Sequence, residues 1–479
     1  VPGPARQRQH STPERCPVEV ASRCMKSIIL ATMLATLLAV GINQVSAQTL
    51  QTVPQQLWPA APDTPPADSA LQLSDELMPA MAPAPLAPQV CIPADGSNRT
   101  YQPFAGCTDA YGCDPAGFKF TWGPDKWAKV GAALRASFNS STYPAPSVGG
   151  NYFTIDNARL LTSGQVTKHI GFELNSDVSL SQSLTPSALT VPSTFDLLDA
   201  IVKVEASDLV NVWAGQFLPP SDRSNIDGPF FINGWDFPFV SNYPAIFQGR
   251  QIGAAYWGQY NGGMLKWSVG AFNGSGGTLQ SPYTNPPDTP PGPNNNIRLD
   301  ARVTINFLDP EPGYYHQSSY YGEKEILAVG FAMQTQHNAY GTAANPVNFT
   351  GMSVDALYET KFENNSVLTL EGAYYHFNDQ DLVSSSQQGE SGFVYAGLML
   401  PYVTEVGPIR GRWRPFVRYQ QYNHDFLAAS TGLYSQGLDL GTEFVINGPN
   451  ARLTAVWSDR DVIGDGTLQI FRLGAQVVF

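Results

Sequence analysis

Charge, cysteine and long apolar runs are all scarce in this sequence. Only 14% of its 479 residues are charged, and it has five Cys and six His. No C-x-x-C-H motif is present, which excludes the attachment pattern of a c-type haem. After the first fifty residues, no apolar run is long enough for a transmembrane helix. Aromatic residues, at 11%, are plentiful, and so are glycine and proline, with 43 Gly and 39 Pro.

The charge balance is acidic. The chain has 27 basic and 40 acidic residues, a net charge of -13. Residues 1–47 carry five of the basic and two of the acidic residues, so the remainder has 22 minus 38, or -16. This balance disfavours a nucleic-acid partner. It says little about a pore, because only the charges that face the lumen act on a permeating ion.

A secretory signal is expected near the start. Met25 and Lys26 are followed by an apolar stretch that ends near Val40, and Ala47 closes a small-residue cleavage site. We therefore interpret residues 25–47 as a signal peptide and residues 1–24 as an upstream mis-start. A transmembrane anchor is the alternative, but the run is short and its flanking charge slight.

Two segments without strand periodicity follow. Residues 48–90 are rich in Pro and Ala and are expected to form an extended periplasmic linker. Residues 91–117 contain Cys91, Cys107 and Cys113. Three Cys are too few for a four-ligand zinc site, so we expect no metal and no cofactor here. One disulfide with one thiol left over is the expectation, and the pair remains open.

From residue 118 onward the chain alternates between apolar and polar residues. Between Ile297 and Phe307 every second residue is apolar and the residues between are polar or charged. Sixteen such segments can be counted, with starts near residues 126, 152, 167, 195, 209, 249, 264, 297, 325, 352, 366, 392, 412, 434, 450 and 468. Strands of this length that are apolar outside and polar inside are typical of a transmembrane antiparallel β-barrel, an all-β fold that must close because hydrocarbon leaves no partner for an open edge.

The connections and the last strand indicate the orientation. Short turns follow most even-numbered segments and long loops follow most odd-numbered ones, which is typical of periplasmic turns and extracellular loops. Two of the expected short turns, 309–323 and 403–410, are longer. With sixteen strands, both termini lie in the periplasm. The final strand, which ends in Phe479, resembles the terminal strand of bacterial outer-membrane β-barrels, and this resemblance implies that the assembly machinery of that membrane binds it.

One long connection is too apolar and too rich in proline for a solvated loop. It runs from Gln216 to Arg250 and is expected to fold into the lumen as the third extracellular loop, where it narrows the pore. An external cap is the alternative. The constriction residues that we predict within it are Pro219, Pro220, Asp222, Arg223, Asp227, Trp235 and Asp236.

Residues 212–220, VWAGQFLPP, carry a family resemblance. They are similar to the G-x-F-x-x-P junction of the phosphate-selective porin O and P family, and the strand order and terminal Phe agree over residues 126–479. The resemblance implies a trimer of sixteen-stranded barrels that conducts anions past lumen arginines. The barrel is also similar to the porin part of porin-cytochrome fusions. Unlike the family pattern, residues 216–250 contain no Lys.

Basic residues on the predicted lumen face are the candidate selectivity residues. Arg412, Arg414 and Arg418 share one parity and are expected to form a basic strip along one strand. Each Arg could instead pair with a carboxylate. Other predicted lumen basic residues are Lys129, Arg135, Arg298, Arg302, Arg452 and Arg472.

The predicted function is passive diffusion of small solutes and ions through an outer-membrane porin, with a preference for anions such as phosphate. The expected partners are outer-membrane lipid and the permeating ions. A redox conduit and, less well supported, a barrel enzyme are the alternatives. The scattered His residues lie beside no nucleophile signature, so no catalytic residue is predicted.

Overall fold

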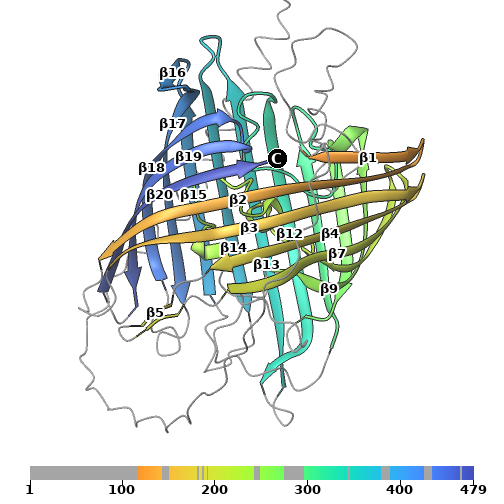
Figure 1. Ribbon diagram of the computed structural model, residues 1–479. Coiled ribbons are helices and arrows are strands. Elements are labelled where there is room, and N and C mark those ends of the chain that lie inside the picture. Colours follow the sequence, from red (N-terminus) through yellow and green to blue (C-terminus); the bar gives the residue numbers. More distant parts are fainter. Residues whose placement is uncertain are drawn as a thin grey trace, which may run out of the picture. The chain divides into compact units, whose positions relative to one another are not determined.

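The fold is described from a computed structural model (Figure 1). The chain divides into two units, Val1–Ser97 and Asn98–Phe479, and all described residues belong to the second. The structure describes residues 117–479, apart from 143–149, 181–182, 186–187, 191–192, 242–248, 275–295, 342–345, 379–388, 425–433 and 464–465. The predicted signal peptide, the linker and the three Cys lie outside these described residues.

Sixteen antiparallel strands form a closed ring in which each strand pairs with its neighbours in the chain. This confirms the predicted fold class and strand number. In order, the strands are β2 (Lys126–Thr142), β3 (Gly150–Thr167), β4 (Ile170–Leu180), β7 (Ser193–Ser207), β8 (Val210–Phe217), β9 (Gln251–Tyr260), β10 (Leu265–Phe272), β11 (Arg298–Asn306), β12 (Ile326–Gly341), β13 (Pro346–Lys361), β14 (Val367–Asn378), β15 (Gly389–Met399), β17 (Ile409–His424), β18 (Tyr434–Asn447), β19 (Ala451–Val462) and β20 (Gly466–Val478).

The ring closes where β20 pairs with β2, and Figure 1 shows these two strands side by side. Ala133 lies opposite Val478, and the main chains of Ala132 and Phe479 exchange two hydrogen bonds of 2.8 and 2.9 Å. The short strand β1 (Phe118–Gly123) pairs with the first residues of β2, beyond the point where β20 ends. The beginning of β2 and the end of β20 therefore lie at one end of the barrel, here called the terminus end.

Polar side chains face the inside of the barrel and apolar side chains face outward, the reverse of the arrangement in a soluble protein. On β11, Arg298 and Asp300 point inward and are at most 1% exposed, whereas Leu299 on the outer face is 55% exposed. On β20, Phe471, Leu473, Val477 and Phe479 are all exposed on the outer face, while Gln476 is buried. Because successive side chains of a strand point to opposite faces, the sequence alternation fixes which residues enter the lumen.

The observed strands begin close to the expected positions. The largest difference is at β13, expected near Met352 and observed from Pro346, a shift of six residues. The two long turns at the terminus end do not change the strand count. One contains β16 (Val403–Val406), which forms a hairpin with the beginning of β17. The other, residues 307–325, contacts the loop that begins after β8, as described below.

Helical structure is minor among the described residues. It consists of α2 (Arg223–Asp227) and the single-turn helices η1 (Phe239–Ser241) and η3 (Asn261–Gly263), and none is long and apolar enough to cross a membrane. A separate hairpin joins β5 (Ser183–Thr185) to β6 (Ala188–Thr190). Both α2 and η1 lie within residues 218–241, in the connection after β8.

Candidate functional site: the barrel lumen

A glycine and a buried aromatic group begin the connection after β8. Gly215 has a φ of 133°, and a Cβ at this position would lie 1.9 Å from the carbonyl oxygen of Ala200 on β7. Only glycine fits this close approach of two main chains. Trp213 and Phe217, both fully buried, then pack against Tyr314, whose ring centre lies 4.7 Å from that of Trp213. The structure thus explains two residues of the predicted G-x-F-x-x-P junction: Gly215 permits the close approach of the strands, and Phe217 packs in the buried aromatic group.

Segment 218–241, which follows Phe217, contacts the inner faces of strands all round the barrel. All of its residues except Phe231, Asp236 and Phe237 are buried. Its main-chain carbonyls accept hydrogen bonds from inward-facing side chains of β2, β11, β12, β17, β19 and β20, and the main-chain N–H of Phe239 donates to Gln420 of β17 at 2.7 Å. The buried Pro219 and Pro220 begin the segment, and the carbonyl of Pro220 accepts from Gln334 at 3.1 Å.

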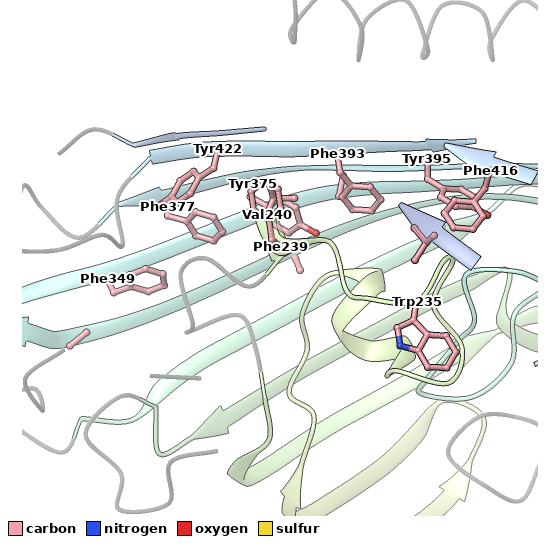
Figure 2. Close-up of a cluster of buried hydrophobic side chains, with 14 residues drawn as sticks. Trp235, Phe239, Val240, Phe349, Tyr375, Phe377, Phe393, Tyr395, Phe416 and Tyr422 are labelled. Atoms are coloured by element: carbon pink, nitrogen blue, oxygen red, sulfur yellow. The ribbon is translucent and has the colours of Figure 1, made fainter. Parts of the chain in front are cut away.

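Aromatic side chains on the inner wall hold one side of segment 218–241. Trp235, Phe239 and Val240 of the segment form one buried cluster with rings from four neighbouring strands, which Figure 2 shows in a row. Two pairs of these rings are stacked, with centroids 5.9 and 5.6 Å apart. The inner wall is therefore apolar here, although it is polar elsewhere. The rings belong to Phe349, Tyr375, Phe377, Phe393, Tyr395, Phe416 and Tyr422.

The predicted strip of three arginines on β17 is only partly assembled. Arg414 and Arg418 point inward and pair with carboxylates, Arg414 with Glu443 at 3.2 Å and Arg418 with Asp439 at 2.7 Å. Arg412 is half-buried and donates instead to the carbonyl oxygens of Leu400, at 2.9 Å, and Asn365. The alternative of Arg–carboxylate pairing therefore describes Arg414 and Arg418, whereas Arg412 serves the turns at the terminus end.

The other predicted basic residues are inward-facing and largely buried. Arg298 pairs with Asp300 at 2.8 Å, Arg302 with Asp355 at 2.6 Å and Arg452 with Glu443 at 2.9 Å. Arg472 pairs with Asp236, and the Lys129 ammonium lies 5.9 Å from the centre of the Trp127 ring.

Arg135 has a different environment from the other arginines. Its guanidinium lies 4.2 Å from the ring centre of Trp235, donates to Asn157 at 3.2 Å and also donates to the carbonyl oxygen of Trp235. Its Nε has no hydrogen-bond partner among the described residues.

The signs of charge are separated around the lumen. The inward faces of β17 to β20 and β2 carry seven basic residues but only two acidic ones, and we call them the basic arc. The inward faces of β11 to β14 carry two basic and four acidic residues, and we call them the acidic arc. The basic arc comprises Arg414, Arg418, Arg452, Arg460, Arg472, Lys129 and Arg135 with Asp439 and Glu443, and the acidic arc Arg298 and Arg302 with Asp300, Asp355, Glu359 and Glu371.

Two features of the lumen were missed by the sequence reasoning. Arg460 of β19 pairs with Asp439 at 2.5 Å, and its parity with Arg452 along one strand was a signal that could have found it. Segment 307–325 was expected to be a turn. Its residues 313–319 are all buried, and Glu311 receives two hydrogen bonds from Arg223, at 2.8 and 2.6 Å. Only its unusual length hinted at this.

A serine, a histidine and an aspartate meet in this region, but not as a catalytic triad. His316 Nδ1 lies 2.7 Å from Asp227, and the Ser318 hydroxyl oxygen lies 2.5 Å from Asp227 and 3.0 Å from Glu371, so its single proton is directed at these carboxylates. A nucleophilic serine would need to donate to the histidine. Burial lowers the pKa of His316 well below its ordinary value, so the imidazole is neutral. His316 and Ser318 of segment 307–325 therefore connect that segment to Asp227 of segment 218–241, and Ser318 is not activated as a nucleophile.

Two carboxylates of the loop segments differ in their protonation. Burial alone would raise the pKa of Glu311, but the Arg223 guanidinium outweighs burial and holds it at about 2, so Glu311 is ionised. Burial raises the pKa of Asp222 to about 6, although Tyr375 and Asn225 donate hydrogen bonds to it at 2.8 and 2.5 Å. Asp222 is thus a loop carboxylate whose charge changes near pH 6, and burial also raises the pKa of Asp227 in the same segment well above its ordinary value.

Comparisons with known proteins found matches among solved structures, and those described below are at most 14% identical to this chain. No protein-family model and no curated protein matches the sequence, so the resemblance to phosphate-selective porins stays a prediction. Among solved structures, the outer membrane channel DcaP of Acinetobacter baumannii is 14% identical, with a TM-score of 0.48 over 76% of this chain and all of that chain. OprB of Pseudomonas putida at high pH is 11% identical, with a TM-score of 0.49 over 74% of this chain and 94% of that one. An anion-selective porin from Comamonas acidovorans is 9% identical, with a TM-score of 0.47 over 74% of this chain and all of that one.

We predict that Gly215→Ala impairs folding of the barrel. A Cβ would clash with the main chain of Ala200 and adopt an unfavourable φ, at a cost of about 1–3 kcal/mol from strain alone. The measurement is the fraction of folded barrel after refolding, seen as heat-modifiable migration on a gel, together with the urea midpoint. Gly150→Ala is the matched control, because its Cβ would meet nothing within 4 Å. Equal behaviour of the two variants would contradict this reading of the junction.

Proposed function

We propose that this chain forms a water-filled channel through a bacterial outer membrane for passive diffusion of small ions and solutes. The observation that carries the proposal is a closed barrel whose strands turn polar and charged side chains inward and apolar side chains outward. A polar, charged lumen inside an apolar outer face is the arrangement of a channel wall.

The outer face supports a membrane setting. Outward-facing Leu, Val, Ile and Phe side chains are exposed on nearly every strand. Such a continuous apolar surface would be unfavourable in water but suits hydrocarbon. We place the terminus end in the periplasm, where a chain exported through a signal peptide would keep its linker. The connection after β8 is then the third extracellular loop, and Phe479 would present the last strand to the barrel-assembly machinery. A homotrimer is the expected assembly.

Segment 218–241 is the constriction in this proposal. It contacts both arcs, since Asn233 receives a hydrogen bond from Arg414 at 2.7 Å and donates one to Glu371 at 2.6 Å. A permeating ion therefore passes between wall charges and loop atoms at short range. The basic arc has seven basic against two acidic residues, so a weak anion preference follows. Selective phosphate binding is not part of the proposal, because most of these arginines already share carboxylates.

Single-channel recording tests the channel directly. Mature protein refolded into planar bilayers should give stepwise conductance in chloride, in multiples of three if the assembly is a trimer. Replacing chloride with phosphate should lower the current through the larger size of the ion, with no block at low concentration. A correctly folded barrel without any conductance would overturn the proposal.

Arg135→Gln should weaken the anion preference. It removes a buried positive charge that no described carboxylate pairs with at ion-pair distance. The ratio of anion to cation permeability should fall by about sevenfold, because one unit charge about 7 Å away in water changes the Boltzmann factor about threefold for the anion and about threefold in the opposite direction for the cation. Reversal potentials across a salt gradient measure this ratio. Arg410→Gln is the control, because that exposed residue pairs with Glu405 in the β16 hairpin. A shift of equal size in both variants would contradict a local effect.

Selectivity should also depend on pH through Asp222. Its carboxyl is neutral below a pKa of about 6 and negative above it. As pH rises through 6, the constriction gains a negative charge beside Asp355, and the anion preference should fall. The reversal potential should therefore move toward the cation value between pH 5 and 7. In Asp222→Asn this step should vanish, and a step that persists would assign the titration to another group.

A further inference from the structure

Segment 307–325 joins segment 218–241 inside the barrel, although the two connect strands at opposite barrel ends. Eight hydrogen bonds link them. Arg223 makes three, with the two carboxylate oxygens of Glu311 and the carbonyl of Gln317 at 2.9 Å. The other five join His316 and Ser318 to Asp227, the main chain of Ser318 to Phe231, Asn233 to the carbonyl of Ser318, and Tyr314 to the carbonyl of Leu218.

The wall holds segment 307–325 independently of that contact. The N–H of Gly313 donates to Gln259 of β9 at 2.8 Å, and Lys266 of β10 donates to the carbonyl of Tyr315 at 3.2 Å. On the other side, Ser319 and the N–H of Tyr320 donate to Glu359 of β13 at 2.7 and 3.0 Å. The segment thus spans from β9 to β13 across the inner face of the barrel. A turn that merely connected β11 to β12 would not need these contacts.

We propose that segment 307–325 is a second constriction, which sets the size limit for solutes together with segment 218–241 through the Arg223–Glu311 ion pair. The inference rests on the proposed channel function. Both side chains of the pair are at most 1% exposed, so their attraction is little screened and neither tolerates loss of its partner. In this proposal the pair keeps the two segments together, so that only ions and small hydrophilic molecules pass them.

Four variants of the full chain test this inference. Arg223→Gln, Glu311→Gln and the double variant each remove the ion pair, and Glu405→Gln removes the exposed pair of the β16 hairpin, 3.1 Å in length, as a control. Proteoliposome swelling with arabinose, sucrose and raffinose measures the size limit. Heat-modifiable migration shows that each barrel is folded.

The expected result is a raffinose swelling rate that rises about tenfold in each pair variant, as for loss of one charge-assisted interaction. The double variant should raise the rate no further than the single ones, because all three lose the same ion pair. Glu405→Gln should match the wild type. If the Glu311 variant does not fold, Ser318→Ala supplies the test, since it removes the hydroxyl contact with Asp227 between the two segments without removing a charge, and it should raise the raffinose rate less strongly.

The same experiment separates failure of the second constriction from failure of the proposed channel function. If the wild type admits arabinose and excludes raffinose, and every folded pair variant does the same, the second constriction is wrong while the channel function stands. Strictly additive effects of the two single variants would also overturn the role of the pair. If the folded wild type admits neither ions nor arabinose, the channel function itself fails.

Discussion

Main-chain hydrogen bonding between β20 and β2 determines the rest of this architecture, because a sheet without that seam would leave two edges unpaired. In hydrocarbon such edges would have no water to bond, so a chain of this kind must form a closed ring. The ten residue pairs from Ala133↔Val478 to Thr142↔Gln469 supply the closure. Closure creates an inside, and alternate residues of every strand must then fill or line it.

Closure of the ring also buries many charged side chains on its inner face. A single unpaired ion in a low-dielectric interior is strongly unfavourable, so inward arginines share carboxylates: Glu443 serves Arg414 and Arg452, and Asp439 serves Arg418 and Arg460. Because paired charges largely cancel, the electrostatic potential in the lumen depends on the net charge of the wall and not on the number of its arginines. For the proposed channel, the excess of positive charge on the basic arc is therefore more informative about ion preference than any one strip of residues.

Segment 218–241 lies within the closed ring and contacts its charged inner wall, and it is the constriction of the proposed channel. Its aromatic side chains rest on the apolar part of the wall, while its main chain meets polar groups of both arcs. Apolar contacts fix the segment on one side of the wall, and hydrogen bonds from inward-facing arginines and glutamines fix its main chain elsewhere. Segment 307–325 adds a second support, and its many hydrogen bonds explain why a loop so rich in proline has a defined structure.

Parity along single strands determined much of this protein from sequence alone. The outward row of Phe471, Leu473, Val477 and Phe479, and the inward Arg298, Arg302 and Arg452, follow from period-two alternation, which depends only on neighbouring residues. The close approach at Gly215 was marked by its motif but explained only by the Ala200 carbonyl of the adjacent strand. The Arg223–Glu311 pair joins residues 88 positions apart, and Arg412 bonds turns that precede its strand. Such contacts depend on how loops meet within a closed barrel, so only the tertiary structure decided them.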